Sequence, residues 1–183
     1  MKPLIVCFSQ TGKTKKLCGC MAKSLDADFV ELKEIAHRGL ASAYTLGVYD
    51  AIRRKSGDIL PVDADISVYD TLIVASPVWA GNLTPAMNDF IREYDLRGKT
   101  VYGLMTHAGG SGEAVNLMRQ ELEQAGAVCP DVLDLQANRE LIYDVKAERK
   151  AFRLTDDGKL ELREQDGDKN NDQKNTAGNE RRG

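Results

Sequence analysis

The chain has 183 residues, of which 42% are apolar, as is typical of one globular domain. Its formal net charge of −3 excludes the basic field that nucleic-acid-binding proteins need. The first apolar run has about five residues, far short of the roughly 20 that cross a bilayer. We therefore expect a cytoplasmic protein with no membrane-inserting segment.

The chain opens with a unit that predicts an anion site. An apolar run at 4–8 predicts a buried strand, and Leu17, Met21 and Leu25 recur every four residues, which predicts a helix. A strand that leads into a helix N-terminus gathers unpaired N–H groups and the positive end of the helix dipole at one spot. The turn between them adds three hydroxyls and one positive charge, from Ser9, Thr11, Thr14 and Lys13. A phosphate suits this turn.

Strand-like and helix-like patterns then alternate along the chain. Four further strands are predicted, at residues 28–35, 69–76, 101–105 and 128–135. Pro130 marks the last strand as an edge strand or a bulged one. Three helices are predicted between them, at 41–55, at 85–94 behind the N-cap Thr84, and at 115–125. The alternation predicts an α/β fold: a three-layer sandwich with a five-stranded parallel sheet and helices on both faces.

The C-terminal part of the chain has a different pattern. Residues 138–150 predict a last helix, so that a main domain spans 1–150. Alternating apolar residues around an Asp-Gly turn predict a β-hairpin at 151–163, which would extend the sheet or lie on a partner. Residues 164–183 are almost free of apolar side chains and predict a disordered polar tail, because they cannot bury enough surface to offset the entropy of ordering.

The four cysteines are Cys7, Cys18, Cys20 and Cys129. They show no Cys-x-x-Cys spacing and have no neighbouring pair of histidines, which a zinc site would need. We therefore expect buried thiols in a reducing compartment and no metal site.

Loops that follow three of the predicted strands should meet, because the carboxyl ends of parallel strands lie at one edge of a sheet. These loops are residues 9–14, 77–83 and 106–112. The second loop holds Trp79, the only tryptophan, which could cover a planar ligand or pack on the next helix. The third loop holds three glycines, which suit a close approach to a ligand or a flexible turn with Ser111 as the helix N-cap.

Residues 7–14 nearly fit the GxxxxGK[ST] phosphate loop of nucleotide triphosphatases, but Cys7 stands where the first glycine belongs. That glycine lets the backbone curl around a β-phosphate. In addition, none of the later predicted strands ends in an aspartate suited to Mg²⁺. A P-loop nucleotide-binding protein is therefore an alternative interpretation of this loop.

The three loops together, in this order, resemble those of the flavodoxin-like family over residues 3–136. The turn at 9–14 is similar to the phosphate loop of that family, the segment 69–90 to its second flavin loop, and 106–112 to its glycine-rich third loop. The resemblance implies an FMN cofactor. The phosphate loop would contribute Ser9, Gln10, Thr11, Gly12, Lys13 and Thr14. The isoalloxazine ring would lie beside Pro77, Val78, Trp79, Ala80, Gly81, Asn82, Thr106, His107, Ala108, Gly109, Gly110 and Gly112.

The resemblance implies an FMN-binding oxidoreductase or electron-transfer flavoprotein, fed by NAD(P)H or a partner reductase and delivering to a quinone or a redox protein. Two departures bear on this choice. Many members have asparagine at the position of Lys13, and many small carriers stack a tyrosine on the flavin where this chain offers His107. A less covered ring and a weak net charge favour an NAD(P)H oxidoreductase over a carrier.

Because the flavin performs the chemistry, we nominate no catalytic side chain. A flavodoxin-like interaction protein without a cofactor is a further alternative. The predicted helix at 41–55 and the hairpin are candidate contact surfaces for an oligomer.

Overall fold

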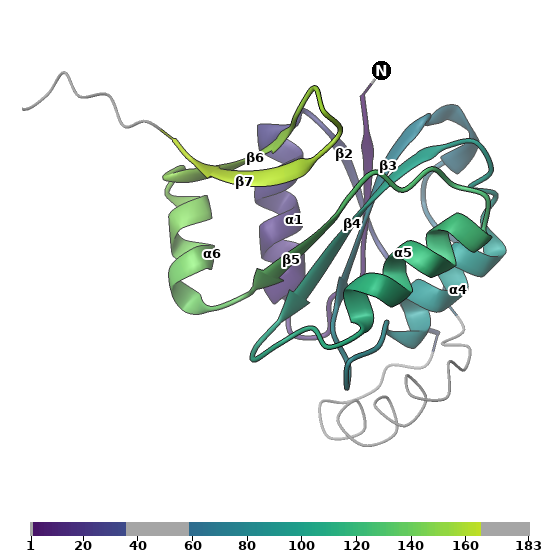
Figure 1. The fold of residues 1–183 in the computed structure, drawn as a ribbon, viewed down its shortest axis with the longest axis horizontal. Helices are drawn as coiled ribbons and strands as arrows, with labels where there is room; N and C mark the ends of the chain where they lie inside the picture. Colours follow the sequence, from purple (N-terminus) through teal and green to yellow (C-terminus); the bar gives the residue numbers. More distant parts are fainter. Residues whose placement is uncertain (1, 36–58, 166–183) are drawn as a thin grey trace, which may run out of the picture.

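A parallel five-stranded sheet forms the centre of the protein, in a computed structural model that describes residues 2–35 and 59–165 (Figure 1). The strands have the order β2-β1-β3-β4-β5, and each neighbouring pair is parallel. They are β1 (Leu4–Cys7), β2 (Asp28–Glu31), β3 (Thr71–Pro77), β4 (Thr100–His107) and β5 (Val132–Gln136). The predicted α/β architecture is confirmed.

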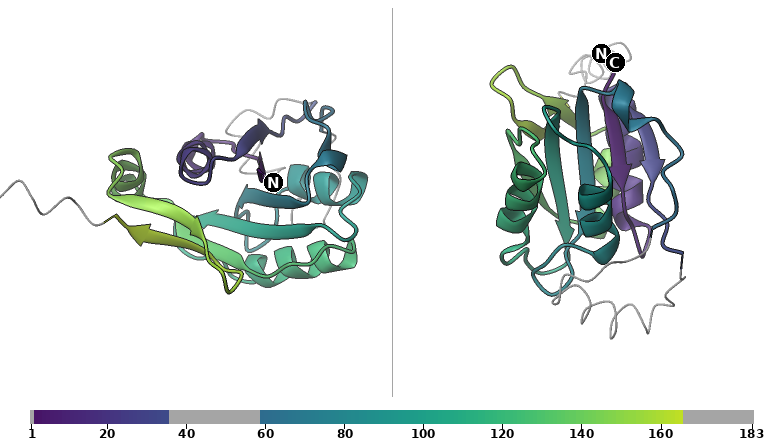
Figure 2. Two further views of the ribbon diagram at one scale, coloured as in Figure 1. Left: turned by 90° about the horizontal axis from the view of Figure 1, so that it is seen from above. Right: turned by 90° about the vertical axis from the view of Figure 1, so that its right-hand side faces the viewer.

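Helices cover both faces of the sheet (Figure 2). They are α1 (Lys13–Ser24), α4 (Pro85–Glu93), α5 (Ala114–Gln124) and α6 (Arg139–Lys146), with a short 3₁₀ helix, η2 (Ile66–Val68), before β3. Helices α4 and α5 pack on one face through Phe90 and Met118. Helices α1 and α6 pack on the other face through Leu17 and Val145. The molecule therefore has the predicted three layers.

The central strands are buried on both faces, which explains their continuous apolar runs. In β1, Leu4 and Val6 point into the core under α4 and α5, while Ile5 and Cys7 point into the core under α1. All four side chains are at most 1% exposed. A strand of alternating apolar and polar residues would be unstable at this position, because neither face of β1 meets water.

Two strands, β2 and β5, are at least three residues shorter than predicted. Strand β2 ends at Glu31 rather than at 35, and Glu34 makes only an isolated bridge with Ile59. Strand β5 begins at Val132 rather than at 128, because Pro130 has no N–H to continue the ladder. Val128 nevertheless forms a parallel bridge with Thr100. Strand β5 is the last strand of the sheet, so the edge position predicted from Pro130 is confirmed.

Other expectations need correction or lie outside the description. Strand β4 continues to His107 and β3 to Pro77, so Thr106, His107 and Pro77 belong to strand ends rather than to loops. The predicted helix at 41–55 lies outside the described residues, as does the polar tail from 166 onward.

The C-terminal hairpin forms as predicted but does not extend the parallel sheet. Its strands, β6 (Lys150–Leu154) and β7 (Leu160–Glu164), pair antiparallel in a separate two-stranded sheet beside α1 (Figure 1). Phe152 and Leu160 are each 1% exposed and share a core with Leu17. The Leu160 N–H also donates to Asp131 Oδ2 at 3.1 Å, which ties β7 to the start of β5. The hairpin is thus part of the core that holds α1.

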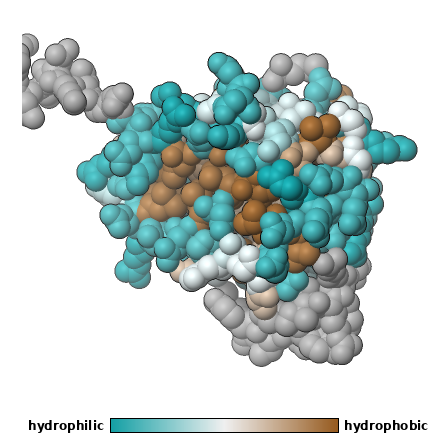
Figure 3. All heavy atoms as spheres, in the orientation of Figure 1, coloured by the Kyte–Doolittle hydropathy of each residue, from teal (hydrophilic) through white to brown (hydrophobic). Residues whose placement is uncertain are grey.

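The surface beside the hairpin carries apolar side chains. Figure 3 shows apolar atoms gathered on the side of the molecule that carries the hairpin and β5. Half-buried leucines of these two elements, Leu133, Leu135 and Leu162, pack against the core of α1. The edge of this core is therefore only partly closed by the described residues.

The cysteines are free thiols. Cys7, Cys18 and Cys129 are buried and Cys20 is half-buried, as the sequence predicts for three of the four. Burial raises the pKa of the Cys18 thiol, and it raises the pKa of Cys129 to about 11. In the described part of the chain, no helix is long and apolar enough to cross a bilayer.

Replacing Phe152 by alanine should lower the free energy of unfolding by about 3–5 kcal/mol, because a fully buried ring leaves a cavity against α1. Urea unfolding followed by circular dichroism measures the change. The matched control is Val68→Ala at a side chain that is 60% exposed, where the change should stay within about 0.5 kcal/mol. Equal stability of the two variants would show that the hairpin does not support the core.

Candidate functional site

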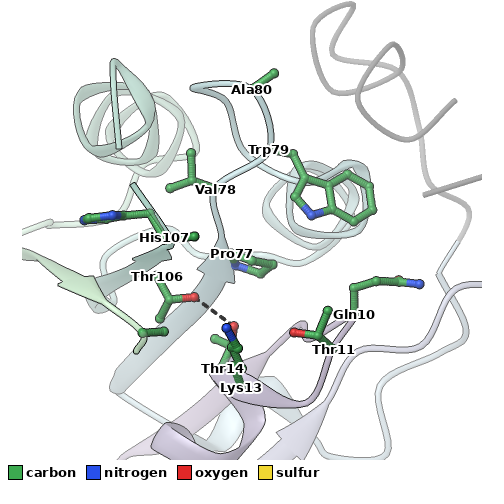
Figure 4. Close-up of a pocket in the computed structure, with 12 residues that line it drawn as sticks. Gln10, Thr11, Lys13, Thr14, Pro77, Val78, Trp79, Ala80, Thr106 and His107 are labelled. Carbon is green, nitrogen blue, oxygen red and sulfur yellow. Dashed lines mark hydrogen bonds between the residues drawn. The ribbon is translucent and has the colours of Figure 1, made fainter. Parts of the chain in front are cut away.

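A cavity of about 450 Å³ lies where β1, β3 and β4 end, and Figure 4 shows the side chains around it. It is lined by Gln10, Thr11, Lys13, Thr14, Pro77, Val78, Trp79, Ala80, Thr106, His107, Ala108 and Ala137. Eleven of these twelve were nominated from the sequence, and Ala137 was not. The other nominated residues, Ser9, Gly12, Gly81, Asn82, Gly109, Gly110 and Gly112, lie in the same three loops without lining the cavity.

The first loop has open hydrogen-bonding groups at the start of α1. Gly12 is the N-cap, with a left-handed φ of 78°, and no side chain caps the helix. No backbone carbonyl of the described residues accepts from the N–H groups of Gly12, Lys13 or Thr14. Ser9 Oγ is buried and has no hydrogen-bond partner in the part of the chain that the structure describes. Such a set of open donors suits an anion.

The charges around this loop leave one lysine available. Lys15 Nζ pairs with Glu31 Oε2 at 2.6 Å, which neutralises it. Lys13 is exposed at the cavity, and none of the described carboxylates forms an ion pair with it. Lys13 can therefore offer its charge to a ligand.

One hydrogen bond joins the first loop to the third. Thr14 Oγ1 lies 2.8 Å from Thr106 Oγ1, and both side chains are at most 3% exposed. Figure 4 shows this bond at the floor of the cavity. It sets the start of α1 against the end of β4.

The second loop is a tight turn that holds Trp79 at the cavity. The N–H of Trp79 donates to the Asn82 carbonyl and the N–H of Asn82 donates to the Trp79 carbonyl, each at 3.0 Å. Ala80 and Gly81 between them have φ values of 49° and 74°, as a type I′ turn requires. The indole meets Phe8 edge to face, with ring centroids 6.0 Å apart. Trp79 thus packs on Phe8, directly after β1, and also lines the cavity.

Thr84 lies at the N-cap of α4 and Pro85 follows at its first position, as predicted. The Thr84 hydroxyl does not cap the helix, however. It lies 3.0 Å from Ser76 Oγ, so it joins the two ends of the second loop.

The third loop is attached to the edge strand β5. His107 Nε2 lies 3.3 Å from Asp134 Oδ1, and Ser111 Oγ donates to Asp134 Oδ2 at 2.5 Å. Gln136 Nε2 also donates to the Ala108 carbonyl at 2.8 Å. Ser111 is therefore not the helix N-cap, a position that Glu113 takes.

The imidazole of His107 does not face the centre of the cavity. Figure 4 shows the ring pointing away from Trp79, and its Nε2 meets Asp134. Its Nδ1 is buried with no hydrogen-bond partner among the described residues. His107 lines the cavity, but its ring serves the attachment to β5.

Asp134 and Gln136 were missed by the sequence analysis. They alternate along β5, where period-2 spacing puts both side chains on one face. Polar residues at alternate positions of an otherwise apolar edge strand were the available signal. Without the fold, nothing indicated that this face meets the third loop.

A family model described as NADPH-dependent FMN reductase matches residues 1–139. Comparison with curated protein sequences found no match.

Solved structures share the fold. A Bacteroides eggerthii protein assigned as a flavoprotein superposes with a TM-score of 0.66 at 19% identity, over 80% of this chain and 94% of that one. A Lactobacillus acidophilus flavoprotein in complex with FMN gives 0.63 at 22% identity, over 73% and 92%. Two-electron reduced flavodoxin from Megasphaera elsdenii gives 0.50 at 18% identity, over 79% and 93%.

The bond between Thr14 and Thr106 can be measured with a double-mutant cycle. Thr14→Val and Thr106→Val each remove one hydroxyl, and the double variant removes both at nearly constant volume. We expect a coupling energy of about 1 kcal/mol from urea unfolding, because each single variant leaves a buried hydroxyl unpaired. Additive effects would mean that the two hydroxyls do not interact.

Proposed function

The chain belongs to the NADPH-dependent FMN reductase family, and on this premise we propose that it is an FMN-dependent oxidoreductase that takes electrons from NADPH and passes them to a quinone or a similar acceptor. FMN as the cofactor follows from the family. NADPH as the donor is supported by the family's description. A small planar acceptor is supported by the absence of Phe, Tyr and Trp from the third loop.

The first loop fits the phosphate of FMN. A phosphate dianion needs several donors and a positive charge, and the loop offers open N–H groups, the unpaired Ser9 hydroxyl and Lys13. We assign the 5′-phosphate to this loop. The compact turn argues against the P-loop alternative, because Cys7 is buried in β1 and only residues 8–12 separate the strand from α1.

The proposal of an enzyme rather than a carrier rests on the end of the cavity to which we assign the flavin ring. Among the described residues that line the cavity, Trp79 is the only Phe, Tyr or Trp, and Thr106, Ala108 and Ala137 have small side chains. The third loop has no aromatic side chain that could cover a flavin there. A second planar molecule, such as a nicotinamide or a quinone, therefore has room to approach.

Bound FMN would supply the chemistry, which is two-electron transfer between the nicotinamide and the acceptor. The protein's residues would hold and orient the cofactor. The first loop would bind the phosphate, the turn at Trp79 would border the ring, and the third loop would face the ring with its backbone. We assign no proton transfer to His107, because its Nε2 is engaged by Asp134.

Anaerobic addition of NADPH to the FMN-loaded protein tests the proposal. We expect the visible absorption of the flavin to bleach without any partner protein, and a quinone to restore it. Bleaching by dithionite but not by NADPH or NADH would instead indicate a carrier fed by a separate reductase. A protein that takes up no FMN would favour the interaction protein without a cofactor.

Lys13→Ala should weaken FMN binding by about tenfold, since it removes one charged hydrogen-bond donor to the phosphate. Binding of riboflavin, which lacks the phosphate, should not change. Quenching of flavin fluorescence measures both affinities. Lys16→Ala is the matched control, because Lys16 is exposed on α1 and does not line the cavity. Equal losses of affinity for FMN and riboflavin would contradict the assignment of the phosphate to this loop.

A further inference from the structure

We propose that Asp134 is a positioning residue that shapes the third loop for the ring of the flavin. The inference rests on the proposed function. It concerns a residue on β5 that does not line the cavity but contacts segment 106–112 twice, through a hydrogen bond from Ser111 and a distance of 3.3 Å to His107 Nε2.

The third loop has little internal support. Gly109 and Gly110 have no atoms within 4 Å of the position that a Cβ would occupy, and Gly110 and Gly112 have φ values of 155° and 55°. Glycines at such angles keep wide freedom in the absence of other contacts. The loop therefore needs an attachment from outside to hold one conformation.

Asp134 provides that attachment before the glycine run and within it. One carboxylate oxygen meets His107 Nε2 at 3.3 Å, before the glycines, and the other accepts from Ser111 Oγ at 2.5 Å, between Gly110 and Gly112. The two oxygens thus contact separate residues of the segment, His107 and Ser111. The hydrogen bond from Ser111 is the stronger kind, because its acceptor is a carboxylate.

The attached loop lies against the second loop. A Cβ on Gly112 would come 3.3 Å from Gly81 Cα, so the backbones of the two loops are nearly in contact. Asp134 thereby also sets the gap between the second and third loops, which border the ring end of the cavity. The phosphate end has its own attachment, the bond between Thr14 and Thr106.

This division predicts different effects on two ligands. Loss of the Asp134 attachment should weaken the binding of FMN and of riboflavin by the same factor, because both ligands carry the ring. Loss of the Lys13 side chain should weaken the binding of FMN alone. The ratio of the two affinities thus separates the ring end from the phosphate end.

The experiment compares Asp134→Ala with Asp134→Asn and with the control Asp95→Ala. Asparagine keeps an oxygen that accepts from Ser111, and Asp95 is a carboxylate paired with Arg97 at the other end of the sheet. We expect Asp134→Ala to weaken FMN and riboflavin by about tenfold each. Asp134→Asn should recover most of this affinity, and Asp95→Ala should bind like the wild type.

A second measurement follows the loop without flavin. ¹⁵N relaxation of Gly109, Gly110 and Gly112 in the flavin-free protein should show lower order parameters in Asp134→Ala, while residues of β4 keep theirs. Loosening of β4 as well would show a merely structural role and would overturn the proposal. So would wild-type affinity for riboflavin in Asp134→Ala, with the proposed function left standing. A wild-type protein that binds neither flavin would overturn both.

Discussion

The site depends on the parallel pairing of β1, β3 and β4. Cys7, the last residue of β1, is in register with Ala75, and Ala75 is in register with Leu104. Strands β3 and β4 then run on together to the pair of Pro77 and Thr106. Because all three point the same way, their loops meet at one edge, and the cavity is a consequence of strand direction.

The two ends of the cavity are built by different interactions. At the end beside the first loop, α1 begins without a side-chain cap and leaves its first donors open beside Lys13. At the end beside the second and third loops, tight backbone turns and small side chains leave a space bordered by Trp79. This asymmetry matches the two parts of FMN, a compact anion and a flat ring, and it is the basis of the proposed function.

The C-terminal hairpin contributes to the site from a distance. None of its described residues lines the cavity, but Phe152 and Leu160 pack in the core shared with Leu17 and Met21 of α1. The first loop, to which we assign the phosphate, leads into the N-terminus of the same helix. The added hairpin thus stabilises the helix whose first turn has open donors.

The sequence by itself determined the order of strands and helices, the three loops and eleven residues of the cavity lining, because these follow from local periodicity, glycine and proline positions and a resemblance in three ordered motifs. The sequence predicted the ends of the strands less well. How far a strand extends depends on the strand beside it, as in the extensions of β3 to Pro77 and of β4 to His107, and β5 begins only at Val132. Only the tertiary structure decided that Thr14 meets Thr106, 92 residues away, that the hairpin packs beside α1, and that Asp134 holds the third loop. Each of these contacts joins segments far apart in the chain. A local pattern can single out such residues, but it does not say which distant residue each one meets, because the contact exists only once the sheet has brought the segments together.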